Sequence, residues 1–169
     1  ALNRLKNWKV YNIQIPDRKW MGKRKKLESL IGSELSSVNR QAKYIIFSFH
    51  DARDNSTRFI INHLSMSGGW LFRKVTEKSS IHTRLTLSFC KDDDKQVIDF
   101  VDARHFGRLD VHEATEFWAE KIQTKLSSLG PDSLKDAITA DILNQRIHNF
   151  VEHNPKWEIK SLLMEQTFL

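Results

Sequence analysis

The sequence has little of several residue types, and each shortage excludes a class of protein. Of 169 residues, one is cysteine, three are proline and six are glycine. The single cysteine, Cys90, excludes an internal disulfide and a cysteine-rich zinc finger within these residues, so we expect a reducing, intracellular setting. No apolar run approaches the roughly 18 residues of a membrane helix. The opening stretch Ala1–Ile15 is polar and basic, so we expect no membrane partner and no signal peptide.

The residues that are present favour a globular protein with an uneven charge. Ten phenylalanines, five tryptophans and 40% hydrophobic residues exclude wholesale disorder. The net charge is +6, and eleven of the 27 lysines and arginines, but only three of the 21 acidic residues, lie in the first 43 positions. A basic end on a near-neutral body suggests a polyanion as partner, although a merely soluble basic surface would look the same.

The pattern of apolar residues predicts short strands in the first two thirds of the chain. Leu2, Leu5 and Trp8 are spaced like the end of a helix, and Leu27 to Ile31 indicates a short helix that ends at Gly32. We predict strands at residues 9–15, 43–49, 58–62, 69–74, 82–89 and 96–101. Polar turns separate them, and the acidic turn 92–94 is typical of a solvated hairpin tip. Short strands at close spacing indicate an antiparallel sandwich or barrel.

After Val111 the period becomes helical. A first helix is expected over residues 117–126, and Gly130-Pro131 ends it. A second is expected over residues 141–151, capped by Thr139, and a third from residue 154. The side chains expected to face inward in the second helix are Ile142, Leu143, Ile147, Phe150 and Val151. The fold class is therefore α+β: an antiparallel β-sandwich domain, residues 1–113, followed by the beginning of a helical domain, residues 114–169.

Two loops carry unusual residues. In the string HLSMSGG, Met66 stands at the tip of a glycine-rich turn, where an apolar side chain either inserts into a partner or tucks back into the core. In DARHFGR, basic residues surround Phe106, and such a loop can reach into a base stack. The alternative is that Phe106 belongs to the core and that Arg104 pairs with Asp102.

Four strings in one order resemble the formamidopyrimidine-DNA glycosylase/endonuclease VIII family of DNA-repair enzymes. They stand here as RQAKY, HLSMSG, DARHFGR and LGPDSL, with the family pattern H-L-G-M-S-G in the second place. The end of the chain, IKSLLMEQTFL, resembles the first helix of the helix–two-turn–helix element of that family. The resemblance implies a β-sandwich lobe and a helical lobe with damaged double-stranded DNA between them. It also implies flipping and excision of an oxidised base, followed by cutting of the strand through β,δ-elimination.

The resemblance also implies roles for particular residues. Lys43 corresponds to a phosphate-contacting lysine and candidate proton donor. Met66, Arg104 and Phe106 correspond to the residues that fill the gap of the flipped base, with Arg104 facing the orphaned partner base. The other expected DNA-binding residues are His63, His82, Lys156 and Lys160. We expect no metal site in these residues, a monomer, and DNA with oxidised bases or abasic sites as partner.

The sequence departs from the family pattern at its start. The family nucleophile is an N-terminal proline followed by glutamate, whereas this chain begins Ala1-Leu2-Asn3. The C-terminal hairpin of the family, usually on a zinc finger, is absent from these residues, so we expect no cofactor within them and leave open whether the complete protein has a zinc finger. One interpretation is a fragment of a glycosylase and abasic-site lyase, which would be inactive as these 169 residues. The other is a catalytically silent relative that binds damaged DNA.

Overall fold

The computed structural model describes residues 2–114, 124, 127–130, 138–153, 156 and 158–163. The chain divides into two compact units, residues 1–118 and 119–169. The domain boundary predicted between residues 113 and 114 stays a prediction. Each unit is described by itself below. Within the described residues, no helix has both the length and the apolar character needed to cross a membrane.

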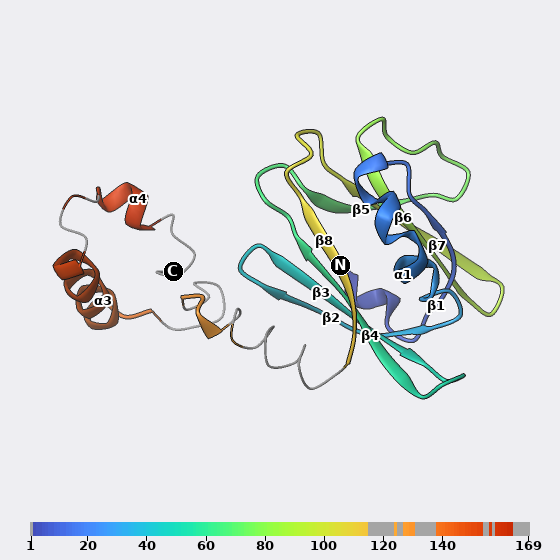
Figure 1. Cartoon of the computed structure of the whole chain (residues 1–169), viewed down its shortest axis with the longest axis horizontal. Helices are drawn as coiled ribbons and strands as arrows, with labels where there is room; N and C mark the ends of the chain where they lie inside the picture. The colour runs from blue at the N-terminus through green and yellow to red at the C-terminus, as the bar shows by residue number, and fades with distance from the viewer. Residues whose placement is uncertain are drawn as a thin grey trace. The chain divides into compact units, whose positions relative to one another are not determined.

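The first unit is a continuous antiparallel sheet of eight strands (Figure 1). The strand order is β5-β7-β6-β1-β2-β3-β4-β8. The strands are β1 (Lys9–Gln14), β2 (Glu34–Gln41), β3 (Tyr44–Asp51), β4 (Ser56–His63), β5 (Gly69–Arg73), β6 (Thr83–Lys91), β7 (Asp94–Val101) and β8 (Arg108–Glu113). Three short helical segments accompany them in residues 2–114: η1 (Leu2–Leu5), η2 (Arg18–Lys23) and α1 (Arg24–Glu28).

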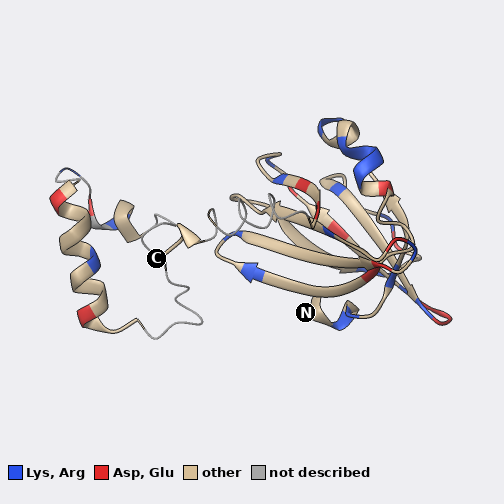
Figure 2. Ribbon diagram, turned by 60° about the horizontal axis from the view of Figure 1, so that its bottom comes forward, with Lys and Arg blue, Asp and Glu red and all other residues tan. Residues whose placement is uncertain are grey.

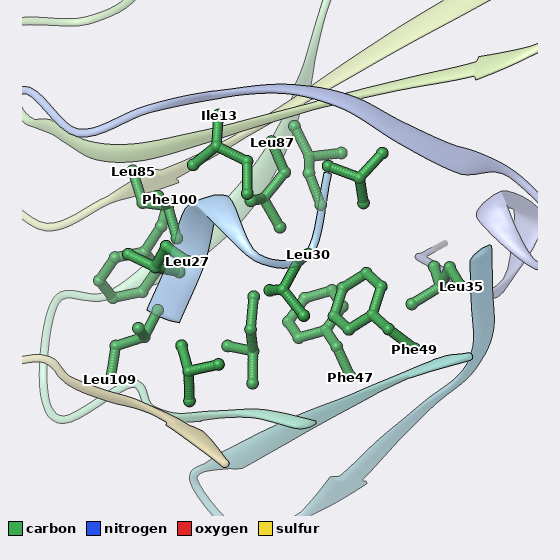
Figure 3. Packing of buried hydrophobic residues seen from close by; sticks show 14 of the residues in the cluster. Ile13, Leu27, Leu30, Leu35, Phe47, Phe49, Leu85, Leu87, Phe100 and Leu109 are labelled. Carbon is green, nitrogen blue, oxygen red and sulfur yellow. The ribbon is translucent and has the colours of Figure 1, made fainter. Parts of the chain in front are cut away.

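The sheet consists of two halves that face each other across one core. β1 and β2 share a single residue pair, Lys9 with Glu34, whereas the other neighbouring strands pair over five to eight positions. Figure 3 shows Leu85, Leu87 and Phe100 on one side of this core and Phe47, Phe49 and Leu109 on the other. Leu27 of α1 and Leu30, which lies two residues after the end of α1, project between the two halves and are fully buried. The predicted β-sandwich with a following helical part is confirmed.

The start of the chain is a short 3₁₀-helix, where the spacing of its apolar residues predicted the end of a helix. Leu2, Leu5 and Trp8 are three apart, which is the period of a 3₁₀-helix, and η1 is such a helix with Leu5 buried. Gly32 ends the short helical stretch with φ of +92°, a conformation that glycine adopts without steric cost.

The second unit contains the helices α3 (Ala140–His153) and α4 (Ile159–Leu163). The predicted cap is confirmed, because the Ile142 N–H donates to Thr139 Oγ1 at 3.3 Å. The inward face predicted for α3 is confirmed only in part: Leu143, Ile147 and Phe150 are half-buried, none of its side chains is fully buried, and Ile142 and Val151 are exposed. A unit of this size has little area with which to cover an apolar face. The predicted helix 117–126 and the start at 154 fall essentially outside the described residues.

Candidate nucleic-acid interface

Strand register brings the predicted DNA-binding loops to one end of the sheet. Tyr44 at the start of β3 pairs with His63 at the end of β4, and His63 pairs with Arg108 at the start of β8. In the other half, Val101 at the end of β7 pairs with both Gly69 and Thr83. The turn 42–43 and the loops 64–68 and 102–107 therefore leave the sheet at the same end, which we call the loop end.

The loop 64–68 presents Met66 to solvent. Met66 is 71% exposed, so it does not tuck into the core. The residue before it, Ser65, has φ of +58°, in the left-handed region that normally favours glycine. The family pattern has glycine at this place, and the serine backbone is strained here by comparison. The loop is held at its base by the Gly68 N–H, which donates to the Leu64 carbonyl at 3.0 Å.

The loop 102–107 presents Phe106 and Arg104. Phe106 is 53% exposed, so the alternative that places it in the core is wrong. The Arg104 guanidinium lies 5.1 Å from the centre of the Phe106 ring, within the range of a cation–π contact. A cation on an exposed aromatic ring gives this loop both the charge and the flat apolar face that base stacking uses.

Asp102 ties the two loops together. Its carboxylate accepts the Ser67 hydroxyl at 2.5 Å, the Gly107 N–H at 2.7 Å and the Arg104 N–H at 3.3 Å. Burial raises the pKa of Asp102, but the hydrogen bonds from Ser67 and from the two backbone N–H groups outweigh it, so the pKa lies below its ordinary value. The ionised Asp102 carboxylate thus holds the backbone of both loops in place. Among the described contacts it forms no ion pair with the Arg104 side chain, which was the predicted alternative.

Ser65 forms a second link between the same loops. Its hydroxyl donates to the Phe106 carbonyl at 2.8 Å and lies 3.0 Å from His63 Nδ1. Because the hydroxyl proton is committed to the carbonyl, His63 donates through Nδ1 to the serine oxygen. The His63 ring in turn packs on Tyr44, with ring centres 4.6 Å apart. A chain of contacts therefore runs from β3 to the backbone of Phe106.

An aromatic floor lies beneath both loops. A Cβ added to Gly68 or to Gly107 would lie 2.8 Å from Phe100 Cζ, closer than real Cβ contacts allow. Phe100 is fully buried and packs on Trp20 and Trp70, each with ring centres 5.4 Å away. The two glycines let the backbone of both loops pack directly on this ring. The Phe100 side chain therefore fixes how far the backbone of each loop lies from the core.

Lys43 and His82 lie in turns at the same end, not within strands. Lys43, the predicted start of a strand, is exposed in the two-residue turn between β2 and β3, one position before the observed strand start at Tyr44. Its carbonyl accepts the Leu64 N–H at 2.8 Å, which joins this turn to the Met66 loop. His82 precedes β6, and its carbonyl accepts the Asp102 N–H at 3.0 Å. The strand placements are corrected by one residue because the backbone must turn before it pairs.

A cavity of about 340 Å³ opens beside the loop end. The residues that line it are Leu2, Asn3, Val38, Asn39, Arg40, Ile45, Leu64 and Trp70. Ligand pockets in proteins begin at about this size. The Arg40 guanidinium donates to the Ala42 carbonyl at 3.0 Å, so a cation borders the cavity next to the Lys43 turn.

Lys156 and Lys160 belong to the second unit. Lys156 lies in a turn, Lys160 lies in α4, and both are exposed. The structure thus brings together Lys43, His63, Met66, His82, Arg104 and Phe106, whereas these two lysines are described only within their own unit.

Sequence reasoning missed the residues that hold the loops. Ser65, Ser67 and Asp102 were visible in the motifs, but their roles depend on contacts between segments 35 to 41 positions apart. One signal was available for Ser65, because a serine stands where the family pattern has glycine.

Residues 2–109 match the family model described as the formamidopyrimidine-DNA glycosylase N-terminal domain. The chain is 31% identical to a formamidopyrimidine-DNA glycosylase of Psychrobacter arcticus, over 94% of the chain and 57% of the relative. The chain belongs to the formamidopyrimidine-DNA glycosylase family. A Prochlorococcus marinus member of this family is 27% identical over 99% of the chain and 58% of its own length. The chain therefore spans less than three fifths of the length of these two relatives.

Solved structures of the family share the fold. Lactococcus lactis formamidopyrimidine-DNA glycosylase, bound noncovalently to DNA with an abasic site, matches with a TM-score of 0.70. The match covers 99% of this chain and 59% of that chain at 24% identity. A complex of the same enzyme with DNA containing a formamidopyrimidine lesion matches with a TM-score of 0.68 at 23% identity. At such identities the likeness establishes the family fold.

Proposed function

We propose that this chain is the lesion-recognising part of a DNA glycosylase that acts on oxidised bases in double-stranded DNA. The observation that carries the proposal is the exposure of Met66 and Phe106 on two loops that hydrogen bonds join at the loop end. A base inside a duplex must be flipped out before an enzyme can reach it, and apolar wedges that enter the stack keep the gap open.

The remaining residues of the loop end fit the same task. Arg104 lies on the Phe106 ring and would face the base left without a partner. Lys43 is exposed next to the Met66 loop and would bind a phosphate beside the flipped nucleotide. His63 and His82 would support or contact the same strand, and Lys156 and Lys160 would bind phosphates from the helical unit. The cavity beside Arg40 has room for the extruded nucleotide.

The proposal extends to an abasic-site lyase in the complete protein. An amine attacks C1′ of the sugar and displaces the base, or water from an abasic sugar, and the sugar ring opens to give an iminium. Loss of a proton from C2′ then expels the phosphate on C3′, and loss of a proton from C4′ expels the phosphate on C5′. This chemistry needs an amine, a carboxylic acid and no cofactor. A terminal amine suits it, because its ordinary pKa of about 8 leaves part of it unprotonated at neutral pH.

Borohydride trapping on a duplex with one abasic site tests the proposal. Borohydride reduces the iminium to a stable amine, so a covalent adduct reports the nucleophile. We expect an adduct with the full-length gene product and a weak one or none with the 169 residues alone. Tight abasic-site binding without an adduct from either protein would favour a silent, lesion-binding relative. Equal affinity for abasic and intact duplexes would overturn lesion recognition itself.

A further inference from the structure

The proposed site leaves the most basic part of the chain without a role. Residues 18–26, which we call the basic segment, contain six lysines and arginines and no acidic residue. They form η2 and the first half of α1, and Figure 2 shows this part of the ribbon as largely blue. Six cations in nine residues repel one another, and a fold tolerates such a density most readily where an anion binds.

The carboxylates of the described residues neutralise only part of this charge. Lys23 pairs with Asp110, and Arg24 approaches Glu28 at 3.8 Å. Arg18, Lys25 and Lys26 are exposed and form no ion pair with a described residue. Lys19 donates only to neutral backbone carbonyls, so its charge also remains uncompensated. The segment therefore keeps cations available to a polyanion.

The basic segment is fixed against the loop that carries Phe106. The Lys19 ammonium donates to the carbonyls of His105 at 2.8 Å and of Gly107 at 3.2 Å, one on each side of Phe106. Trp20 is buried and stacks on Phe100, the ring beneath the same loop. Asp17 caps η2 by accepting the Lys19 N–H at 2.9 Å. The segment is thus anchored beside the Phe106 loop through Lys19 and Trp20, and the cations that follow continue from this support along η2 and α1.

We infer that the basic segment binds the sugar–phosphate backbone of the strand opposite the lesion. The inference rests on the proposed function, in which Arg104 faces the orphaned base. The orphaned base belongs to the strand opposite the lesion. The basic segment is anchored to the loop that carries Arg104, so the sugar–phosphate backbone nearest to the segment would be that of the same strand. Arg18, Lys25 and Lys26 then contact phosphates without reading sequence, and they hold the undamaged strand while the wedge enters.

Salt dependence of binding to an abasic duplex measures the contacts. The test variant carries Arg18→Gln, Lys25→Gln and Lys26→Gln and keeps Lys19 and Lys23, which support the fold. Each lost phosphate contact lowers the slope of log affinity against log salt by about 0.9, so we expect a slope smaller by about 2–3 and roughly tenfold weaker binding at low salt. An unchanged slope would overturn the inference.

A matched control separates this effect from net charge. Lys6, Lys9 and Lys91 are exposed at the opposite end of the sheet, where Lys9 pairs with Cys90. Their triple replacement by glutamine removes the same charge, and we expect it to leave the slope within about one of the parent. Slopes lowered equally in both triple variants would show a general charge effect and overturn the inference.

Neutral phosphates identify the strand. Methylphosphonates at three positions around the orphaned base should weaken binding by the parent protein and leave the triple variant unaffected, because its contacts there are already lost. The strand assignment would be overturned if the methylphosphonates weakened binding by the triple variant as much as by the parent. It would also be overturned if methylphosphonates on the damaged strand gave the pattern expected for the opposite strand. Failure of the proposed function looks different: the parent itself would bind abasic and intact duplexes equally.

Discussion

At the scale of single residues, the loop end exposes apolar groups that sequence reasoning could single out but not place. Met66 and Phe106 stood out because polar loops seldom carry such side chains, and both also had a core alternative. Their exposed fractions exclude that alternative. Their proximity could not be predicted, because it depends on the Ser65 hydroxyl reaching a carbonyl 41 positions away.

Truncation of the wedge tests its proposed role. Met66→Ala and Phe106→Ala should each weaken binding to an abasic duplex by about 1–3 kcal/mol, because each removes a surface on which a base stacks. Binding to an intact duplex, where no gap is filled, should change much less. Fluorescence anisotropy with the two duplexes measures both affinities.

Leu71 provides the control for this pair. It is 57% exposed on β5, away from the loops, so Leu71→Ala removes similar apolar surface without touching the wedge. We expect no change with either duplex. If Met66→Ala and Phe106→Ala weakened both duplexes equally, insertion into the stack would be excluded.

Two replacements of Ser65 distinguish the effect of backbone strain in its loop from the effect of the hydrogen bond that joins the two loops. Ser65→Gly relieves the left-handed backbone by about 1 kcal/mol and loses a hydrogen bond of about the same size, so the free energy of unfolding should hardly change. Ser65→Ala keeps the strain and loses the bond, so it should destabilise by about 1 kcal/mol. Both should bind abasic DNA more weakly, because the hydroxyl that joins the two loops is gone. Chemical unfolding and anisotropy measure the two effects, and full binding by Ser65→Gly would show that the linkage is dispensable.

At the scale of elements, the sequence predicted six of the eight strands and missed β2 and β8. The strands β3, β4 and β7 appear within two residues of their predicted ends. β2 escaped, because a bulge between Leu35 and Ser37 places the apolar Leu35 and Val38 three residues apart instead of two or four. β1 has a similar bulge after Val10 but was still predicted, because it is rich in β-branched and aromatic residues, which β2 is not. A bulge therefore hides a strand only where the residue types do not already indicate one.

The packing of both loops on Phe100 predicts an intolerance of side chains. Gly107→Ala would place a Cβ 2.8 Å from the Phe100 ring and 3.0 Å from Asp102 Oδ2. Overpacking of this kind costs about 1–3 kcal/mol. Gly69→Ala is the control, because nothing lies within 4 Å of its added Cβ. The midpoint temperature of thermal unfolding of Gly107→Ala should be well below that of Gly69→Ala. Equal midpoints would show that the Phe100 ring moves to accommodate the added Cβ.

At the scale of the whole first unit, a buried charge cluster holds the end of the sheet opposite to the loops. Asp51 is buried and pairs with Arg53 at 2.6 Å and with Arg58 at 2.7 Å. Hydrogen bonds from the Arg53 side chain and backbone and from Arg58 outweigh burial and hold the pKa of Asp51 far below its ordinary value. The cluster lies on β3, β4 and the turn between them, and the Arg53 guanidinium also donates to the Ile31 carbonyl at 2.8 Å, so it fixes the end of this half to the segment that precedes β2.

Acid titration of stability tests this cluster. A carboxyl with a lowered folded pKa stabilises fully above its unfolded value, near pH 4, and loses that contribution as the pH falls toward the folded value. Asp51→Asn should cost about 3 kcal/mol near neutral pH, because Arg58 loses its buried partner. The difference from the parent should shrink below about pH 4, as urea unfolding across pH would show. A gap that stays constant with pH would contradict an ionised Asp51.

The ring of Phe100 beneath two glycines has a consequence for selectivity. Because both loops rest on this buried ring, the height of their backbone is set before any contact with DNA. A stack that has lost one base offers a gap to the side chains they carry, whereas an intact stack would have to deform to admit them. Because folding has already ordered these loops, little conformational freedom remains to be lost on contact with DNA. Discrimination between damaged and sound DNA would then reside in the stiffness of the protein as much as in the chemistry of the lesion.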